Sequence, residues 1–254
     1  MSDDLLWAYG VVAAGAPLPD DIEPVADGEL VVLTARVPRD EYAVEPLREH
    51  LNDLAWLERV ARRHEAVLEQ ALAQATVVPL RLCTIFDDAD GVRRMLERER
   101  EPLTRALARL DGRQEWGVKL LVDGDRLAAT AAPAGDQAQG EGGAAYLARR
   151  RNERQAREGA RALAMQIVDD VDGSLRAHAV DAVRLPAQNR ELSGHTGDMV
   201  LNAAYLVDAD GAGALHEAAA ELPGRHADAG ARIELTGPWP PYNFVTGETT
   251  TQPA

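Results

Sequence analysis

The chain has 254 residues, a formal net charge of −15, and 46% hydrophobic and 27% charged residues, which is the composition of a folded globular protein. Its acidic surface repels phosphate groups and so argues against nucleic acid as a partner. Cys83 is the single cysteine, which excludes an intramolecular disulfide and any metal site built from several cysteines, and fits a reducing compartment.

The N-terminal apolar run follows two aspartates, whereas a signal peptide needs positive charge at that place. The run also contains Gly10, Gly15 and Pro17, and it is too short to span a bilayer. We therefore expect a cytoplasmic protein without a membrane partner.

Hydrophobic patterns along the first half alternate between strand and helix character. They predict strands over 5–13 and 29–37, a long amphipathic helix over 47–71, a strand over 76–86, helices over 87–101 and 102–110, and a strand over 114–122. Pro79 indicates that its strand lies at an edge or contains a bulge. Aspartates are placed to cap the helix over 87–101, and Pro102 separates it from the next helix.

The second half has the element order helix, strand, strand, helix, strand. The helix runs over about 144–178, and the strands and second helix follow in "DAVRLPA", "DMVLNAAYLVD", "GAGALHEAAAEL" and "ARIELTG". We therefore expect an α+β protein with two domains. Residues 1–125 form a modified ferredoxin-like sheet with helices on one face, residues 126–143 a linker, residues 144–245 an α+β domain that begins with a long helix, and residues 246–254 a flexible tail.

Catalytic and metal-binding patterns are absent from the sequence. Ser193, His195 and Asp198 lie in one glycine-rich turn without the strained elbow that holds a nucleophilic serine in hydrolases. The histidines have no metal-ligand spacing, and His64 on the apolar helix face predicts a buried, hydrogen-bonded side chain. We expect no catalytic residues, no metal, no cofactor and no small-molecule substrate.

Residues 149–161 carry six arginines and two glutamates, a local charge of +4. Two interpretations stay open for this run. It is a solvated helix face with pairs such as Arg154–Glu158, or it is a docking stripe for an acidic partner.

Four segments together resemble the gas vesicle protein F/L family. They are "LLWAYGVV", "VVPLRLCTIFDD" with the helix and "EWGVKL" that follow, "NAAYLVD", and "LTGPWPPYNFV" near the end. Family members usually carry a Phe-Gly pair where this chain has Leu82 and Cys83, a departure that we relate to strand packing.

The resemblance implies a two-domain protein without enzyme activity that is needed to form gas vesicles. It implies the gas vesicle as location, and as partners the main shell protein, which is small, apolar and prone to self-assembly, and other accessory proteins. Two roles stay open: an assembly factor with chaperone-like or nucleating action, and a structural wall component. A small-molecule-binding or enzymatic ferredoxin-like protein is the alternative from another class.

Partner-binding candidates are exposed arginines and aromatics, because these residue types dominate interface energies. They are Arg81, Trp239, Tyr242 and Phe244. Because its prolines prevent a core of its own, the segment "TGPWPPYNFV" must pack on something else. It is either a clasp on the same chain, formed by Trp239, Pro240, Pro241, Tyr242 and Phe244, or an exposed docking peptide.

Overall fold

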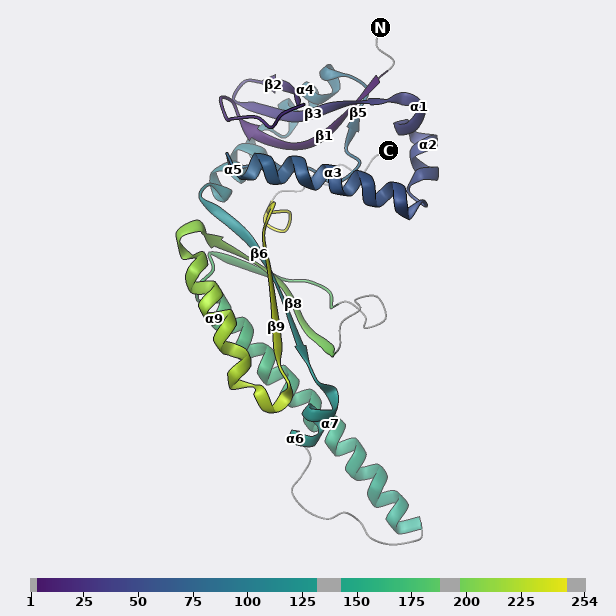
Figure 1. The fold of residues 1–254 in the computed structure, drawn as a ribbon, viewed down its shortest axis with the longest axis vertical. Coiled ribbons are helices and arrows are strands. Elements are labelled where there is room, and N and C mark those ends of the chain that lie inside the picture. Colours follow the sequence, from purple (N-terminus) through teal and green to yellow (C-terminus); the bar gives the residue numbers. More distant parts are fainter. Residues whose placement is uncertain (1–3, 132–142, 188–196, 246–254) are drawn as a thin grey trace. The chain divides into compact units, whose positions relative to one another are not determined.

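The computed structural model describes residues 4–131, 143–187 and 197–245. Their contacts divide the chain into two compact units. The first contains residues 1–114 together with the segment from Trp239 onward, and the second contains Glu115–Pro238. Each unit has its own sheet and its own helices (Figure 1). The predicted α+β class is confirmed.

The first sheet is built around its longest strand, β1 (Asp4–Ala13). The other strands are β2 (Glu23–Asp27), β3 (Leu30–Pro38), β4 (Val78–Pro79) and β5 (Ile85–Phe86). Their order is β2-β3-β1-β4, and β5 also pairs with β1. β1 and β3 are antiparallel with a bulge between Ala8 and Gly10. β4 is at one end of this order, so Pro79 lies at the edge position predicted for it.

Five helices accompany this sheet: α1 (Arg39–Tyr42), α2 (Val44–His50), α3 (Leu54–Leu72), α4 (Ala89–Arg98) and α5 (Arg100–Leu110). Buried side chains of α3 form one core cluster with Trp7, Tyr9 and Leu33. The eight successive residues from Leu5 to Val12 of β1 are all buried, and successive side chains point to opposite faces, so both faces are covered. α4 and α5 contact the sheet with side chains outside the α3 cluster, which places helices on both faces instead of one.

Helix boundaries follow the side chains that cap them. Asp53 accepts hydrogen bonds from the backbone N–H groups of Ala55 and Trp56, and thereby begins α3. The predicted helix over 47–71 is therefore two helices. Asp88 caps α4 as predicted, and Pro102 lies in the first turn of α5, where its missing N–H costs nothing.

The second sheet has the order β7-β8-β6-β9. Its strands are β6 (Arg113–Val122), β7 (Asp181–Arg184), β8 (Asp198–Asp208) and β9 (Arg232–Trp239). Among its described residues, the helices of this unit are α6 (Gly124–Ala131), α7 (Gly143–Arg176) and α9 (Ala212–Arg225), with short 3-10 turns η1 (Ala209–Gly211) and η2 (Ala227–Ala229). One core joins alternate residues of β6 and β8 to the inner sides of the three helices.

The unit boundary differs from the predicted domain boundary at residue 125. Alternate residues of β6, among them Trp116, Val118 and Leu120, pack with Tyr205 in the second core, so this strand belongs to the second unit. The first part of the predicted linker, residues 126–131, lies in the helix α6, whose Leu127 is buried in the same core. Residues 132–142 and the predicted tail 246–254 lie outside the described residues.

Candidate functional site

Arg81 lies in the short connection between β4 and β5, the two strands that pair with neighbouring stretches of β1. Its side chain is exposed. Its carbonyl oxygen accepts hydrogen bonds from the N–H of Thr84, 3.2 Å away, and from the Thr84 hydroxyl, 2.7 Å away. The predicted strand over 76–86 is thus two short strands separated by a tight turn at the sheet edge.

A buried histidine fastens this edge to the core. Trp7 donates its indole N–H to Nδ1 of His64 (3.0 Å), so the ring proton is on Nε2, which donates to the carbonyl oxygen of Leu80 (3.1 Å). Burial lowers the pKa of His64 to about 4, so the ring is neutral near pH 7. This is the buried, hydrogen-bonded histidine that the sequence predicts, and it fixes the residue before Arg81.

Cys83 occupies the turn with a φ of 64°, the left-handed region that favours glycine. The glycine that the resemblance implies at this place would suit this backbone conformation. Burial raises the pKa of the Cys83 thiol, which keeps it protonated and poorly nucleophilic.

The C-terminal segment divides into anchored and exposed residues. Phe244 is 1% exposed, and Pro240 and Pro241 are buried as well, whereas Trp239 and Tyr242 are 38% and 39% exposed. Its last turn is closed by hydrogen bonds from the N–H groups of Tyr242 and Phe244 to the carbonyl oxygens of Pro240 and Pro241. Phe244 is unavailable to a partner in this conformation, so among the predicted binding residues only Arg81, Trp239 and Tyr242 are accessible.

Three exposed apolar residues around the start of α3 were missed by sequence reasoning. They are Val44 on α2, Leu51 and Leu54, of which Leu54 is 80% exposed. Leu51 and Leu54 fall within the single amphipathic helix that the sequence predicts over 47–71. The break between His50 and Leu54 turns them outward, and the capping residue Asp53 was the signal for that break.

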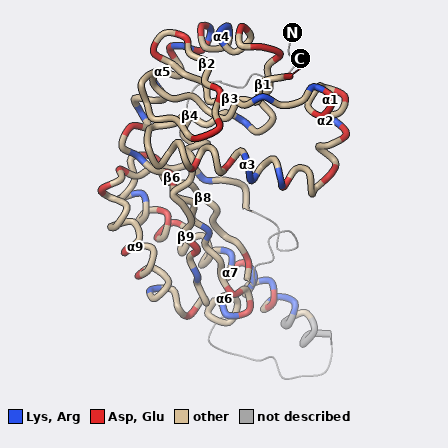
Figure 2. The backbone as a smooth tube through the Cα atoms, turned by 45° about the horizontal axis from the view of Figure 1, so that its top comes forward, with Lys and Arg blue, Asp and Glu red and all other residues tan. Residues whose placement is uncertain are grey.

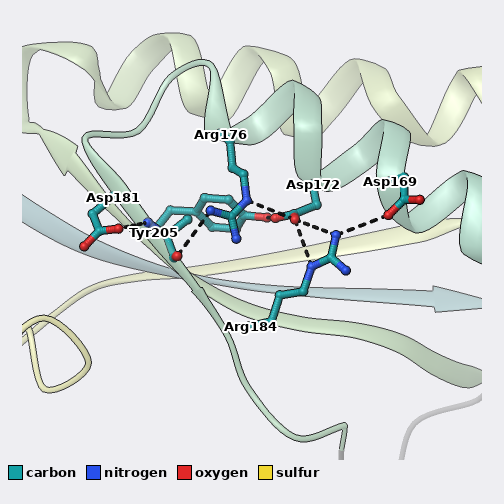
Figure 3. Close-up of polar contacts among 7 residues, drawn as sticks. Asp169, Asp172, Arg176, Asp181, Arg184 and Tyr205 are labelled. Carbon is teal, nitrogen blue, oxygen red and sulfur yellow. Dashed lines mark hydrogen bonds and ion pairs between the residues drawn. The ribbon is translucent and has the colours of Figure 1, made fainter.

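A buried carboxylate joins three elements of the second unit (Figure 3). Asp172 of α7 accepts hydrogen bonds from the hydroxyl of Tyr205 on β8 (2.6 Å) and from Nε of Arg176 (3.0 Å) and of Arg184 on β7 (2.9 Å). Burial alone raises the pKa of Asp172, but these hydrogen bonds outweigh it and hold the pKa below its usual value. Burial and the bond to Asp172 raise the pKa of Tyr205.

Such a carboxylate is a structural anchor and not a proton donor. A general acid at neutral pH needs a raised pKa, whereas that of Asp172 is lowered and the carboxylate is ionised. Among the described residues, no group of three histidine, cysteine or acidic side chains could hold a metal ion. Ser193 and His195 lie outside the described residues, and Asp198 begins β8.

Within the described part of the chain, no helix combines the length and apolar character needed to cross a bilayer.

Comparison with known proteins gives consistent matches over nearly the whole chain. Residues 5–246 match the family model described as gas vesicle synthesis protein GvpL/GvpF. The chain is 39% identical to gas vesicle protein L of a Streptomyces species over 222 residues, which are 86% of this chain and 80% of that protein. It is 25% identical to gas vesicle protein F2 of Halobacterium salinarum over 253 residues, 96% and 94% of the two chains.

Two crystal structures share the fold. Gas vesicle protein GvpF from Anabaena matches with a TM-score of 0.72 and 19% identity, over 96% of this chain and 97% of that one. GvpF from Microcystis aeruginosa matches with a TM-score of 0.69 and 16% identity, over 97% and 100% of the two chains.

Proposed function

The chain belongs to the GvpL/GvpF family of gas vesicle synthesis proteins, and from this membership we propose that it is a non-enzymatic assembly factor that binds the main shell protein. A shell subunit with one water-excluding face exposes apolar strand surface before it is built into a wall, and such surface aggregates unless it is covered. The chain would cover that surface and keep the complex dispersed through its net charge of −15.

The exposure of Trp239 and Tyr242 on an anchored segment is the observation that carries this proposal. Aromatic side chains contribute much of the binding energy in protein interfaces, and they bind best when little conformational freedom is lost. The buried Phe244, Pro240 and Pro241 hold the two aromatic rings on a fixed backbone. A partner would therefore meet a pre-ordered apolar surface instead of a flexible peptide.

The short edge strands β4 and β5 support a second contact in the same unit. An edge strand can add a strand from another protein through backbone hydrogen bonds. Arg81 is exposed in the connection between them and could contact a partner strand that arrives at this edge.

Co-expression with the main shell protein tests the proposal. The readouts are the fraction of shell protein in the cleared lysate and its recovery on the tagged chain. We expect both to increase with the wild-type chain and to fall back with Trp239→Ser and Tyr242→Ser combined. A matched double variant, Leu18→Ser with Val180→Ser, removes two other exposed apolar side chains and should behave as wild type.

Equal solubility and recovery of the shell protein with and without the chain would refute this function. Washing of purified gas vesicles distinguishes the structural wall component from the assembly factor. A wall component stays with the vesicles through repeated washing, whereas a transient assembly factor is removed. Asp172, the buried carboxylate of the second unit, already accepts three hydrogen bonds, an arrangement that favours a structural role for it over ligand binding or catalysis.

A further inference from the structure

The N-terminal half of α7 presents a stripe of six exposed residues. They are Leu147, Arg150, Arg154, Arg157, Arg161 and Met165. At 3.6 residues per turn their side chains fall within an arc of about 80° around the helix axis, over a length of about 27 Å. This part of α7 extends beyond the sheet of its unit (Figure 1), and the helix carries several marked cationic positions (Figure 2).

Another side of the same helix half is occupied. Gly159 lies so close to α6 that a Cβ atom built on it would come within 3.1 Å of the carbonyl oxygen of Ala131. Ala160 and Leu163 pack against the core of the unit. The stripe lies away from these residues, with Leu147 and Met165 at its ends 66% and 60% exposed.

Intrahelical ion pairs account for only part of these arginines. Arg154 donates to Glu158 at 2.8 Å, the i,i+4 pair that the sequence predicts. The side chains of Arg157 and Arg161 form neither a hydrogen bond nor an ion pair with any described residue. Two adjacent charges of the stripe are therefore not explained by stabilisation of the helix itself.

The charge distribution indicates which kind of partner can bind the stripe. Residues 149–161 carry +4, so the other 241 residues of the chain carry −15 − 4 = −19. A long polyanion, such as a nucleic acid or an anionic membrane, would meet this excess of negative charge beyond the stripe, whereas a short acidic segment would not. The apolar ends favour a partner that has apolar residues on both sides of its acidic ones.

We infer that this arginine stripe of α7 binds an acidic amphipathic helix of a partner protein. Glutamates or aspartates spaced three and four residues apart on that helix pair with Arg150, Arg154, Arg157 and Arg161. Apolar residues at its two ends contact Leu147 and Met165. The stripe belongs to the second unit, whereas Trp239 and Tyr242 belong to the first, so the chain would act as an adaptor that holds two partners of opposite character.

The test uses the full chain and a fluorescein-labelled helical peptide of about 20 residues, matched to the stripe by a rise of 1.5 Å per residue. Glutamates at the four facing positions and leucines at both ends make it complementary, and a peptide with glutamine at those four positions is the uncharged control. Fluorescence anisotropy gives the affinities. The variant is Arg157→Gln with Arg161→Gln. Its matched control, Arg63→Gln with Arg94→Gln, removes two exposed arginines that also form no ion pair with any described residue.

We expect the acidic peptide to bind the wild-type chain and the Arg63/Arg94 control alike. Its affinity should fall about tenfold in the Arg157/Arg161 variant, since exposed charge pairs contribute modestly. Binding should also weaken when salt is raised from about 50 to about 300 mM. Equal losses in the two variants, no binding, or equal affinity for the glutamine peptide would overturn the proposal.

Three further probes distinguish other occupants. They are a labelled DNA duplex, phosphatidylserine vesicles, and the chain itself in sedimentation velocity. If DNA or vesicles bind more tightly than the acidic peptide, and the Arg157/Arg161 variant loses this binding, the occupant of the stripe is a polyanion and not an acidic helix. Self-association that disappears in the Arg157/Arg161 variant would make a second copy of the chain the occupant. Either result contradicts the inference.

Discussion

Tyr205 donates a hydrogen bond to the carboxylate of Asp172 across 2.6 Å, and so ties the strand β8 to the long helix α7. The side chains of Arg176 and Arg184 donate to the same carboxylate, which gives the buried charge three donors (Figure 3). A buried charge is tolerated when such partners replace its hydration. The network thus fixes how α7, β7 and β8 pack within the second unit.

Replacing Asp172 should destabilise this unit strongly. We expect Asp172→Asn to lower the free energy of unfolding by about 2–3 kcal/mol, because three donors lose their charged acceptor although both arginines can still reach water. Urea unfolding measures this loss. Asp169→Asn is the control, because Asp169 is exposed and contacts only Arg184 among the interactions described; it should cost at most about 0.5 kcal/mol. Equal losses for the two variants would contradict the anchoring role.

The same carboxylate makes a prediction at low pH. The pKa of Asp172 is lower in the folded protein than in the unfolded chain. Its contribution to stability is therefore complete above the unfolded value of about 3.9 and is lost as the pH falls through the folded value. Unfolding curves below pH 4 should converge for wild type and Asp172→Asn.

His64 should give stability a different pH dependence. Its pKa is about 4 in the folded protein and about 6.5 when unfolded, so between these values the unfolded chain binds more protons. Stability is then complete above pH 6.5 and falls by about 3 kcal/mol as the pH decreases to 4. His64→Gln should flatten this slope in urea unfolding, whereas His178→Gln, an exposed histidine, should retain it. An unchanged slope in His64→Gln would refute the assignment.

Cys83→Gly should stabilise the protein by about 0.5–1 kcal/mol. A non-glycine residue in the left-handed region costs about 1–2 kcal/mol, of which the greater freedom of glycine in the unfolded chain offsets part. Thermal unfolding measures the gain. Cys83→Ala keeps the Cβ atom and should bring none, so a similar gain from both substitutions would point to the thiol instead of the backbone.

Removing residues 239–254 should lower the melting temperature by several degrees. Phe244 is the buried part of that segment, so Phe244→Ala alone should reproduce most of the loss, about 3 kcal/mol. Trp239→Ser with Tyr242→Ser should change the melt little. A truncation after Val245 keeps all described residues and is the control. A full deletion that melts like wild type but no longer retains shell protein would instead make the segment a docking peptide.

The exposed apolar residues near the start of α3 allow a prediction for binding without a change in fold. Leu51→Ser with Leu54→Ser should leave the melting temperature unchanged, because both side chains already meet water. If these residues add to the shell-protein contact, recovery of the shell protein in the co-expression assay falls. The Leu18/Val180 pair again provides the control. A lower melting temperature would show that the pair stabilises the fold.

Local signals predicted most elements correctly, since the caps, prolines and hydrophobic periods that define them lie within a few residues. The sheet to which a strand belongs could not be predicted from local sequence. The strand over 114–122 has the same composition in either sheet, and only the packing of Trp116 and Val118 with Tyr205 decides where it belongs. The buried carboxylate of Asp172 was missed for a related reason, because its donors come from an adjacent turn of α7 and from two strands further along the chain.

The first unit is made of two stretches of chain that are 124 residues apart, since Glu115–Pro238 forms the second unit between them. During synthesis the chain leaves the ribosome from its N-terminus. The second unit can therefore be complete before Phe244 has emerged, whereas the first unit still lacks the segment that contains Phe244. Trp239 and Tyr242 reach their anchored positions only after the second unit has been synthesised. A nascent chain would then present these two rings only after both sheets have been synthesised, which delays any shell-protein contact through them until the strands of both units have emerged.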